Sequence, residues 1–293
     1  MNAPFALSEP APRGLGRVRR GGWSWGPVES AQIRVLSLGS GIQSSTLAHM
    51  AAHGEIEGPA PDFALLAEME ELEATERQTD FLSSGNVLPF PIDRTGNGRL
   101  LSEDLRARAQ GTGRGVSIPF FTERGQARRQ CTREFKVQPI EKRLRHLLGF
   151  KPRQRIPPKS AEVWIGFSTD EVIRAGPAYS PWVVHRFPLL ELGMSVHDCI
   201  AWLERHGYPV PQRSKCVFCP FRTNAEWRWM KANEPESWSR AVAVDKDVRS
   251  HGHLRVPGFL HPSLKPLDEV DLSTPEQRGQ GSLLEVCEAG CGL

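Results

Sequence analysis

Glycine and hydroxyl residues follow an apolar segment near the start of the chain. The apolar segment is Ile33–Leu38, and glycines stand at the first and third positions after it. Glycine has no Cβ, so a backbone can approach an anion there, and the N-terminus of a following helix offers unpaired N–H groups and the positive end of its dipole. The sequence therefore predicts an anion-binding loop that contains Ser37, Gly39, Ser40, Gly41, Gln43, Ser44 and Ser45.

This loop matches neither of the two common phosphate-binding patterns. A Walker loop ends in Gly-Lys-Ser or Gly-Lys-Thr, and a dinucleotide-binding loop has a third glycine where this chain has Ser44. An ordinary connection between a strand and a helix is the alternative interpretation, because such turns are often rich in glycine and serine. The choice between them depends on the other residues of the chain.

Six cysteines form the second group of residues that could do chemistry. Cys216 and Cys219 are a CxxC pair followed by proline, and two thiolates at this spacing can bind one metal centre. Cys131 lies in the basic stretch 128–133, where neighbouring cations favour a thiolate. One CxxC alone is compatible with either metal or redox chemistry, and Cys131 is a candidate reactive thiol.

The other cysteines are interpreted separately. Cys287 and Cys291 form a Cys-x-x-x-Cys pair at the end of the sequence. Cys199 lies on an apolar helical face and is expected in the core. Iron and zinc both accept thiolates, but no second CxxC completes a four-cysteine zinc site, which favours an iron–sulfur cluster over zinc.

Length and charge place limits on the class of protein. A chain of 293 residues can bury a full core, and its net charge is only +3. Basic residues gather in 124–155, which is interpreted either as a solvated basic helix or as a phosphate or nucleic-acid contact face. No run of 18 apolar residues predicts a membrane span, and residues 1–30 lack the apolar region of a secretion signal, so we expect a cytoplasmic protein.

The predicted elements alternate between strands and helices. Strands are expected at Ile33–Leu38, Asp62–Ala67, Val87–Ile92 and Glu162–Phe167. Helices are expected at Ser44–His53, Glu70–Ser83, Lys136–Leu148, Val196–His206 and Asn224–Ala232. This order predicts an α/β fold with a mostly parallel, doubly wound sheet, whose ligands bind beyond the carboxyl ends of the strands.

Three regions are expected along the chain. Residues 1–30 are a flexible arm, 31–180 a nucleotide-binding α/β domain, and 181–293 a helical C-terminal region that carries the CxxC and the terminal cysteine pair. Within the second region, residues 94–127 are rich in glycine and are expected as a mobile loop that could close over a substrate.

Several of these features occur together and in order. They are the Gly/Ser loop, an acidic segment after the second strand, Gly166-Phe-Ser-Thr-Asp-Glu171 with Arg174, Cys131 and the distant CxxCP. In this combination the chain resembles the phosphoadenosine phosphosulfate reductase-like branch of the PP-loop ATP pyrophosphatase superfamily, over about residues 33–293. It looks most similar to small phage and bacterial proteins of that branch.

The resemblance implies an adenine nucleotide α-hydrolase-like fold in which the loop holds the phosphates of ATP or of an adenylyl sulfate. It implies roles in nucleotide or Mg²⁺ binding for Glu68, Gly166, Asp170 and Arg174, and a charge-stabilising role for Lys136. Two positions depart from the superfamily pattern, because Gln43 stands where an aspartate is usual and Glu68 where an Asp-Thr-Gly turn is usual. Asp170 is alternatively a helix cap, and Arg174 alternatively a surface ion-pair partner.

One implied activity is that of an ATP-dependent sulfurtransferase. A substrate oxygen attacks the α-phosphate, pyrophosphate leaves, and sulfur carried by the protein displaces AMP. In such relatives a [4Fe–4S] cluster holds or delivers the sulfur, which implies Cys131, Cys216 and Cys219 as its ligands, Cys287 or Cys291 as the fourth, and a catalytic role for Cys131. The acceptor would be a tRNA, a DNA or a small metabolite, and a separate sulfur donor would be a partner.

Two alternatives remain open. The chain ends Gly-Cys291-Gly-Leu, which resembles the C-terminal cysteine motif of adenylyl sulfate reductases. Cys291 would then attack the sulfur of the substrate, and a thioredoxin-like reductant would resolve the product. The other alternative is a non-catalytic partner protein that binds a nucleotide or a nucleic acid.

Overall fold

The computed structural model describes residues 19–85, 87–109, 116–252, 254–274 and 277–278. The chain forms two compact units. The sheet unit comprises the residues up to 69 together with 74–98 and 132–214, and the cysteine unit comprises 70–73, 99–131 and the residues from 215 onward. Residue 180, where a boundary is expected from the sequence, lies inside the sheet unit.

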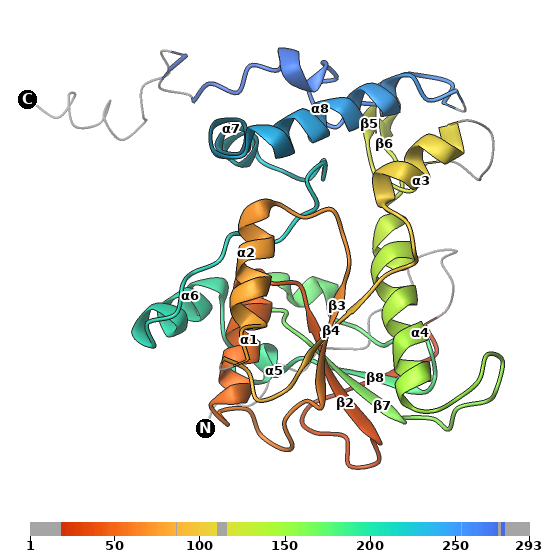
Figure 1. The fold of residues 1–293 in the computed structure, drawn as a ribbon, viewed down its shortest axis with the longest axis vertical. Helices are drawn as coiled ribbons and strands as arrows, with labels where there is room; N and C mark the ends of the chain where they lie inside the picture. The colour runs from red at the N-terminus through yellow and green to blue at the C-terminus, as the bar shows by residue number, and fades with distance from the viewer. Residues whose placement is uncertain (1–18, 86, 110–115, 253, 275–276, 279–293) are drawn as a thin grey trace, which may run out of the picture. The chain divides into compact units, whose positions relative to one another are not determined.

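The sheet unit is built on six strands that all pair in parallel (Figure 1). Their order across the sheet is β1-β8-β7-β2-β3-β4. The strands are β1 (Gly22–Ser24), β2 (Ile33–Leu38), β3 (Phe63–Ala67), β4 (Ile92–Thr95), β7 (Ala161–Ile165) and β8 (Val183–Arg186). A sheet of this kind is the predicted α/β, parallel class, which is therefore confirmed.

Helices cover both faces of this sheet, as a doubly wound fold requires. One face packs its apolar side chains against α1 (Ile42–Ala52), α2 (Glu73–Leu82) and α6 (Val196–Arg205). The other face packs against α4 (Gln138–Leu147) through Val35, Leu65 and Leu144. Because both faces are covered, β3 is apolar along its whole length, and β2 is interrupted only by Arg34 and Ser37. The remaining elements of this unit are η2 (Thr132–Val137), η3 (Thr169–Arg174) and α5 (Pro188–Glu191).

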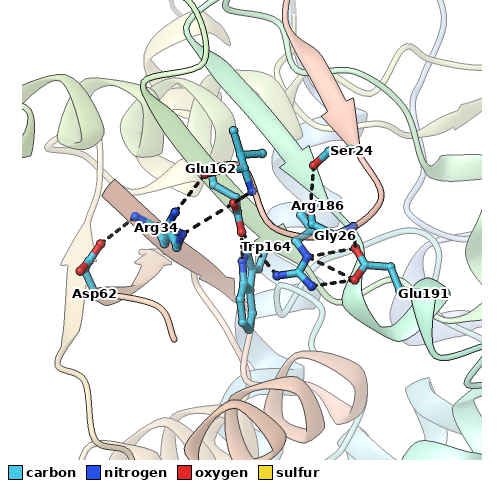
Figure 2. Close-up of polar contacts among 9 residues, drawn as sticks. Ser24, Gly26, Arg34, Asp62, Glu162, Trp164, Arg186 and Glu191 are labelled. Atoms are coloured by element: carbon cyan, nitrogen blue, oxygen red, sulfur yellow. Dashed lines mark hydrogen bonds and ion pairs between the residues drawn. The ribbon is translucent and has the colours of Figure 1, made fainter. Parts of the chain in front are cut away.

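A buried charge network joins β7 and β8 to the segment after β1 (Figure 2). Glu162 and Arg186 are both fully buried, and Arg186 donates two parallel hydrogen bonds to the carboxylate of Glu191, at 3.0 and 2.8 Å. Glu162 accepts hydrogen bonds from the indole of Trp164 and the backbone N–H of Val28, and lies 3.7 Å from the Arg186 guanidinium. Each buried charge therefore has partners, which offsets its desolvation.

The cysteine unit is smaller and mainly helical. Its elements are α3 (Leu101–Ala107), β5 (Phe121–Thr122), β6 (Gly125–Gln126), α7 (Asn224–Asn233), α8 (Pro235–Arg249) and η4 (Leu267–Glu269). The buried carboxylate of Glu70 accepts hydrogen bonds from the backbone N–H and the hydroxyl of Ser102, both at 2.8 Å, and pairs with Arg240 of α8. Asp245 of α8 accepts the backbone N–H groups of Leu260 and Leu267 and so fixes the irregular segment that follows.

Several predicted elements are wrong or incomplete. The third strand is Ile92–Thr95 and not Val87–Ile92, because the prolines at 89 and 91 remove backbone donors before it. The predicted loop 94–127 contains α3, β5 and β6. The predicted helix Lys136–Leu148 is divided into the π-helix η2 and α4, which begins beside Pro139. Residues 22–24, expected within a flexible arm, form an edge strand.

Among the described residues, the helices are too short or too polar for any of them to span a membrane.

Candidate functional site

The direction in which successive strands are added to the sheet reverses between β2 and β7. The chain runs from β2 through β3 to β4 on one side, and then crosses over to β7 and β8 on the other. The loops after β2 and β7 therefore leave the carboxyl edge of the sheet side by side and in opposite directions. In open parallel sheets, ligands bind in the crevice at such a switch point. The predicted anion-binding loop is the loop after β2.

The first turn of α1 has the features of an anion site. Gly41 precedes the helix in an extended conformation and caps it with no side chain, and the first turn carries no acidic residue. Within its own first turn, the helix therefore has no carboxylate that neutralises its N-terminal N–H groups or the positive end of its dipole. Ser44 Oγ accepts the N–H of Gly39 at 3.2 Å, which closes the loop on the helix.

Ser40 gives the loop a strained backbone. Its φ is +51°, in the left-handed region that residues with a Cβ adopt at a cost, and its side chain is fully buried. Its hydroxyl accepts a 2.7 Å hydrogen bond from Thr79 of α2. Ser45 also faces α2, and its hydroxyl accepts from Gln78 at 3.4 Å. These two hydroxyls hold the loop against α2, and Ser37 lies inside β2. We therefore expect the backbone N–H groups to be the main anion donors.

Two glycines of the site are required by close approach of other backbone. A Cβ on Gly166, just after β7, would lie 3.1 Å from backbone atoms of Gln43 and Ser44. A Cβ on Gly41 would lie 3.0 Å from the backbone nitrogen of Ser214. By contrast, a Cβ on Gly39 would meet its nearest neighbour at 3.8 Å, which is ordinary contact. The third glycine of this site is thus Gly166, which follows β7 and does not belong to the loop after β2.

The polar residues after β7 bind mainly to each other. Asp170 accepts the backbone N–H of Val196 at 2.7 Å, and this bond lowers the pKa of its carboxyl. Because Val196 is the first residue of α6, Asp170 makes the contact of a helix cap, which is the alternative interpretation of this residue. Arg174 pairs with Glu171 and stacks on Phe167. The amide of Gln43 reaches Glu171 Oε2 at 3.4 Å and links the two loops of the switch point.

Glu68 supplies an exposed carboxylate at the same edge of the sheet, directly after β3. Its Oε2 lies against the backbone of Gly96, where a Cβ would approach to 2.7 Å. One carboxylate is sufficient for Mg²⁺ that is bound mainly through substrate phosphates and water. Lys136, the other predicted residue of the sheet unit, lies in η2 and is half-buried.

The cysteine unit contains the CxxC pair. Cys216 and Cys219 form a tight turn, in which the N–H of Cys219 donates to the carbonyl of Cys216 at 3.0 Å. The Cys216 thiol donates to the sulfur of Cys219, and this bond, followed by the backbone N–H of Phe221 and the cations of Arg222 and Arg129, lowers the pKa of Cys219 to about 6. The same bond and burial raise the pKa of Cys216. Cys219 is therefore the thiolate of the pair.

The sequence analysis overlooked Arg222 as a functional residue. Its side chain is 5% exposed and donates to the carbonyls of Lys215, Cys216 and Val217, at 2.8, 2.9 and 3.3 Å. These bonds fix the backbone of the CxxC turn while the positive charge favours the thiolate of Cys219. An arginine two residues after a CxxCP was the available signal, because a charge beside a thiol pair is rarely incidental.

The third predicted thiol is close to this pair. Cys131 is buried, and its charge influences Cys216, as does that of Glu71. The three sulfurs do not converge on one point. Among the described residues, no three cysteine sulfurs lie within 4.8 Å of one another. Cys287 and Cys291 lie outside the described residues. Cys199 is fully buried in the core of the sheet unit, as expected from its helical face.

Alkylation of the metal-free protein should distinguish these thiols. We expect Cys219 to react with iodoacetamide with a midpoint near pH 6, because the thiolate exists above its pKa. Replacing Cys216 with alanine removes the donated S–H bond and should move that midpoint upward. Cys199 is the control, since burial raises its pKa to about 12 and should keep it unreactive at neutral pH. Mass spectrometry of peptides measures how far each cysteine has reacted. Equal reaction of Cys199 and Cys219 at pH 7 would contradict this assignment.

Comparisons with known proteins give a single distant likeness to report. No family model matches the chain, and no curated protein matches it. A solved structure, phosphoadenylyl-sulfate (PAPS) reductase from Candida auris in a phosphate complex, is similar over 60% of this chain and 73% of its own, with 12% identity and a TM-score of 0.38. At that TM-score we draw no functional conclusion from the likeness.

Proposed function

We propose that the protein is an adenine-nucleotide-dependent sulfurtransferase with an adenine nucleotide α-hydrolase-like fold. The loop after β2 binds the phosphates of ATP, and the thiols of the cysteine unit handle sulfur. The observation that carries the proposal is the glycine-lined first turn of α1, which has no side-chain cap and no acidic residue of its own, at the switch point of a parallel sheet. Sequence resemblance alone suggests the adenine base and the reaction class.

The proposed chemistry at the loop is charge stabilisation. Pyrophosphate leaves more readily when N–H donors and cations stabilise the charge that develops on the α-phosphate. The backbone N–H groups of Gln43 and Ser44 are the candidate donors, Glu68 the candidate carboxylate for Mg²⁺, and Lys136 the candidate cation. Gln43 contributes an amide in place of a carboxylate, so the proposal assigns it positioning through Glu171.

Cys216 and Cys219 are hydrogen-bonded to each other and could share one ion, so the preference for an iron–sulfur cluster over a single zinc ion depends on the greater separation of Cys131. Ligands of one zinc ion all contact the same atom, whereas the cysteines of a cluster bind different irons and stand farther apart. Cys131, Cys216 and Cys219 would hold the cluster, which when bound would carry or deliver sulfur. Cys219 is already a thiolate near neutral pH and so needs little proton release to become a ligand.

A thiol-based reductase is the second candidate, favoured by the low pKa of Cys219. A thiolate of this kind can attack sulfur directly, as in disulfide exchange. This function would make Cys219, and not only Cys291, a candidate nucleophile. It requires the CxxC pair to be free of metal.

Metal analysis of anaerobically purified protein separates the two candidates. The sulfurtransferase predicts about four irons and four sulfides per chain, with broad absorbance in the visible region. Cys131→Ser and Cys216→Ser should lower both contents by more than half, whereas Cys199→Ala should leave them unchanged. A wild-type protein without iron and sulfide would contradict the cluster, and a CxxC pair that is also free of metal would favour the thiol-based reductase.

A further inference from the structure

Helices α1 and α6 end in the same way. Each has a histidine as its C-cap, followed by a glycine in the left-handed conformation, Gly54 with φ +72° and Gly207 with φ +72°. After each glycine the chain turns back, so that Glu55 N–H donates to Met50 O at 3.0 Å and Tyr208 N–H donates to Leu203 O at 2.9 Å. These paired bonds are those of the Schellman motif, which glycine favours.

The two helix ends meet, because α1 packs against α6. The rings of His53 and His206 have centroids 5.3 Å apart. One nitrogen of each ring and one carboxylate oxygen of Glu55 all lie within 4.8 Å of one another. Two histidines and one glutamate are the protein ligands of a common type of zinc site, in which water completes the tetrahedron.

Each of the three side chains is oriented by a neighbouring hydrogen bond. His206 donates from Nδ1 to the carbonyl of Trp202 at 2.8 Å, which leaves the lone pair on Nε2, 3.8 Å from Glu55 Oε1. The indole N–H of Trp202 donates to the other oxygen of Glu55 at 2.9 Å. His53 Nε2 is bonded to the hydroxyl of Tyr208 at 2.8 Å. Partners of this kind fix the ring orientation and tautomer of metal-binding histidines.

The local charge also favours a cation. The carboxyl ends of two helices converge here, and each carries the negative end of its dipole. All three ligands are exposed to solvent, so an ion can enter.

We propose that His53, Glu55 and His206 form a zinc-binding site that ties the carboxyl end of α1 to that of α6. The ligand atoms need to move by less than about 1 Å each to reach zinc at about 2.0–2.2 Å. Because the opposite end of α1 forms the phosphate loop, the bound ion stabilises the helix on which that loop depends. This site is independent of the cysteines and of the proposed sulfur chemistry.

Zinc titration of the full-length protein tests the site. Calorimetry should detect one more Zn²⁺ per chain in the wild type than in His206→Ala, and Glu55→Gln should weaken that event at least tenfold. His197→Ala is the matched control, because His197 is exposed at the other end of α6 and should leave the titration unchanged. Identical zinc titrations of the wild type and His206→Ala would overturn the proposal.

A spectroscopic readout keeps this site distinct from the thiols. Co²⁺ bound at His53, Glu55 and His206 should give ligand-field bands without thiolate charge transfer, and His206→Ala should abolish only those bands. The zinc-loaded wild type should also unfold at a higher temperature than the zinc-free protein, by an amount that His206→Ala removes. Thiolate charge transfer that grows with the same equivalent of Co²⁺ would assign the ion to the cysteines and contradict the proposal.

Discussion

Replacing Arg186 with leucine is expected to destabilise the sheet unit by about 3–5 kcal/mol, the range for breaking a buried ion pair by removal of one partner. Arg186 is fully buried and serves both Glu191 and Glu162, which would be left without their shared cation (Figure 2). The guanidinium also lies 5.1 Å from the ring of Trp164, so its loss removes packing as well as charge. Urea unfolding followed by tryptophan fluorescence measures the loss.

The pair of Arg94 and Glu76 is the matched control. These side chains are 40% and 44% exposed and lie 3.3 Å apart. Arg94→Leu should change the free energy of unfolding by less than about 1 kcal/mol, because exposed pairs are screened by water. If Arg186→Leu cost no more than Arg94→Leu, the buried network would not be a determinant of the fold.

The second large effect concerns ligand binding. Gly166→Val is expected to weaken ATP binding at least tenfold, which corresponds to about 1.4 kcal/mol. Its side chain would collide with the backbone of Gln43 and Ser44, already 3.1 Å from where a Cβ would stand. The first turn of α1 must then move, and its N–H groups would no longer converge on a phosphate. Calorimetric titration with Mg·ATP, at a temperature where both proteins are folded, measures the change.

A glycine of the sheet unit outside the loop provides the control. Gly22→Ala in β1 should bind ATP within a factor of about three of the wild type, because its Cβ would stand 3.6 Å from the nearest atom. A general sensitivity of the sheet unit to an enlarged glycine would affect both variants alike. Equal binding by Gly166→Val and the wild type would show that the first turn of α1 does not contact the nucleotide.

The parallel sheet and the position of the loop were predictable from local patterns. Ile33–Leu38 is an apolar run bounded by glycine, and the strand has those bounds in the structure. Val183–Arg186 was not predicted, because a strand that contains His185 and Arg186 looks polar. Its arginine is buried with Glu162 of the neighbouring strand β7 and Glu191 of α5 as partners, which neutralise its charge. Periodicity cannot detect such compensation.

The candidate site was predictable in part. Residue types identified the loop, Cys131 and the CxxC pair, but not which hydroxyls face an anion. Ser40 and Ser45 are turned toward α2, a fact that depends on packing between two helices. The hydrogen bonds from Arg222 to the backbone of the CxxC turn depend on the path of that turn. The approach of Gly166 to α1 arises from a contact between residues far apart in the sequence. The same holds for the meeting of His53 and His206.

Amide hydrogen exchange in the presence of ATP tests the central claim most directly. If the loop after β2 binds the nucleotide phosphates, peptides that cover residues 39–45 should exchange more slowly when Mg·ATP is added, and the Gly166→Val variant should lose that protection. Protection confined to other parts of the chain, or no change at saturating ATP, would contradict a phosphate site at the N-terminus of α1.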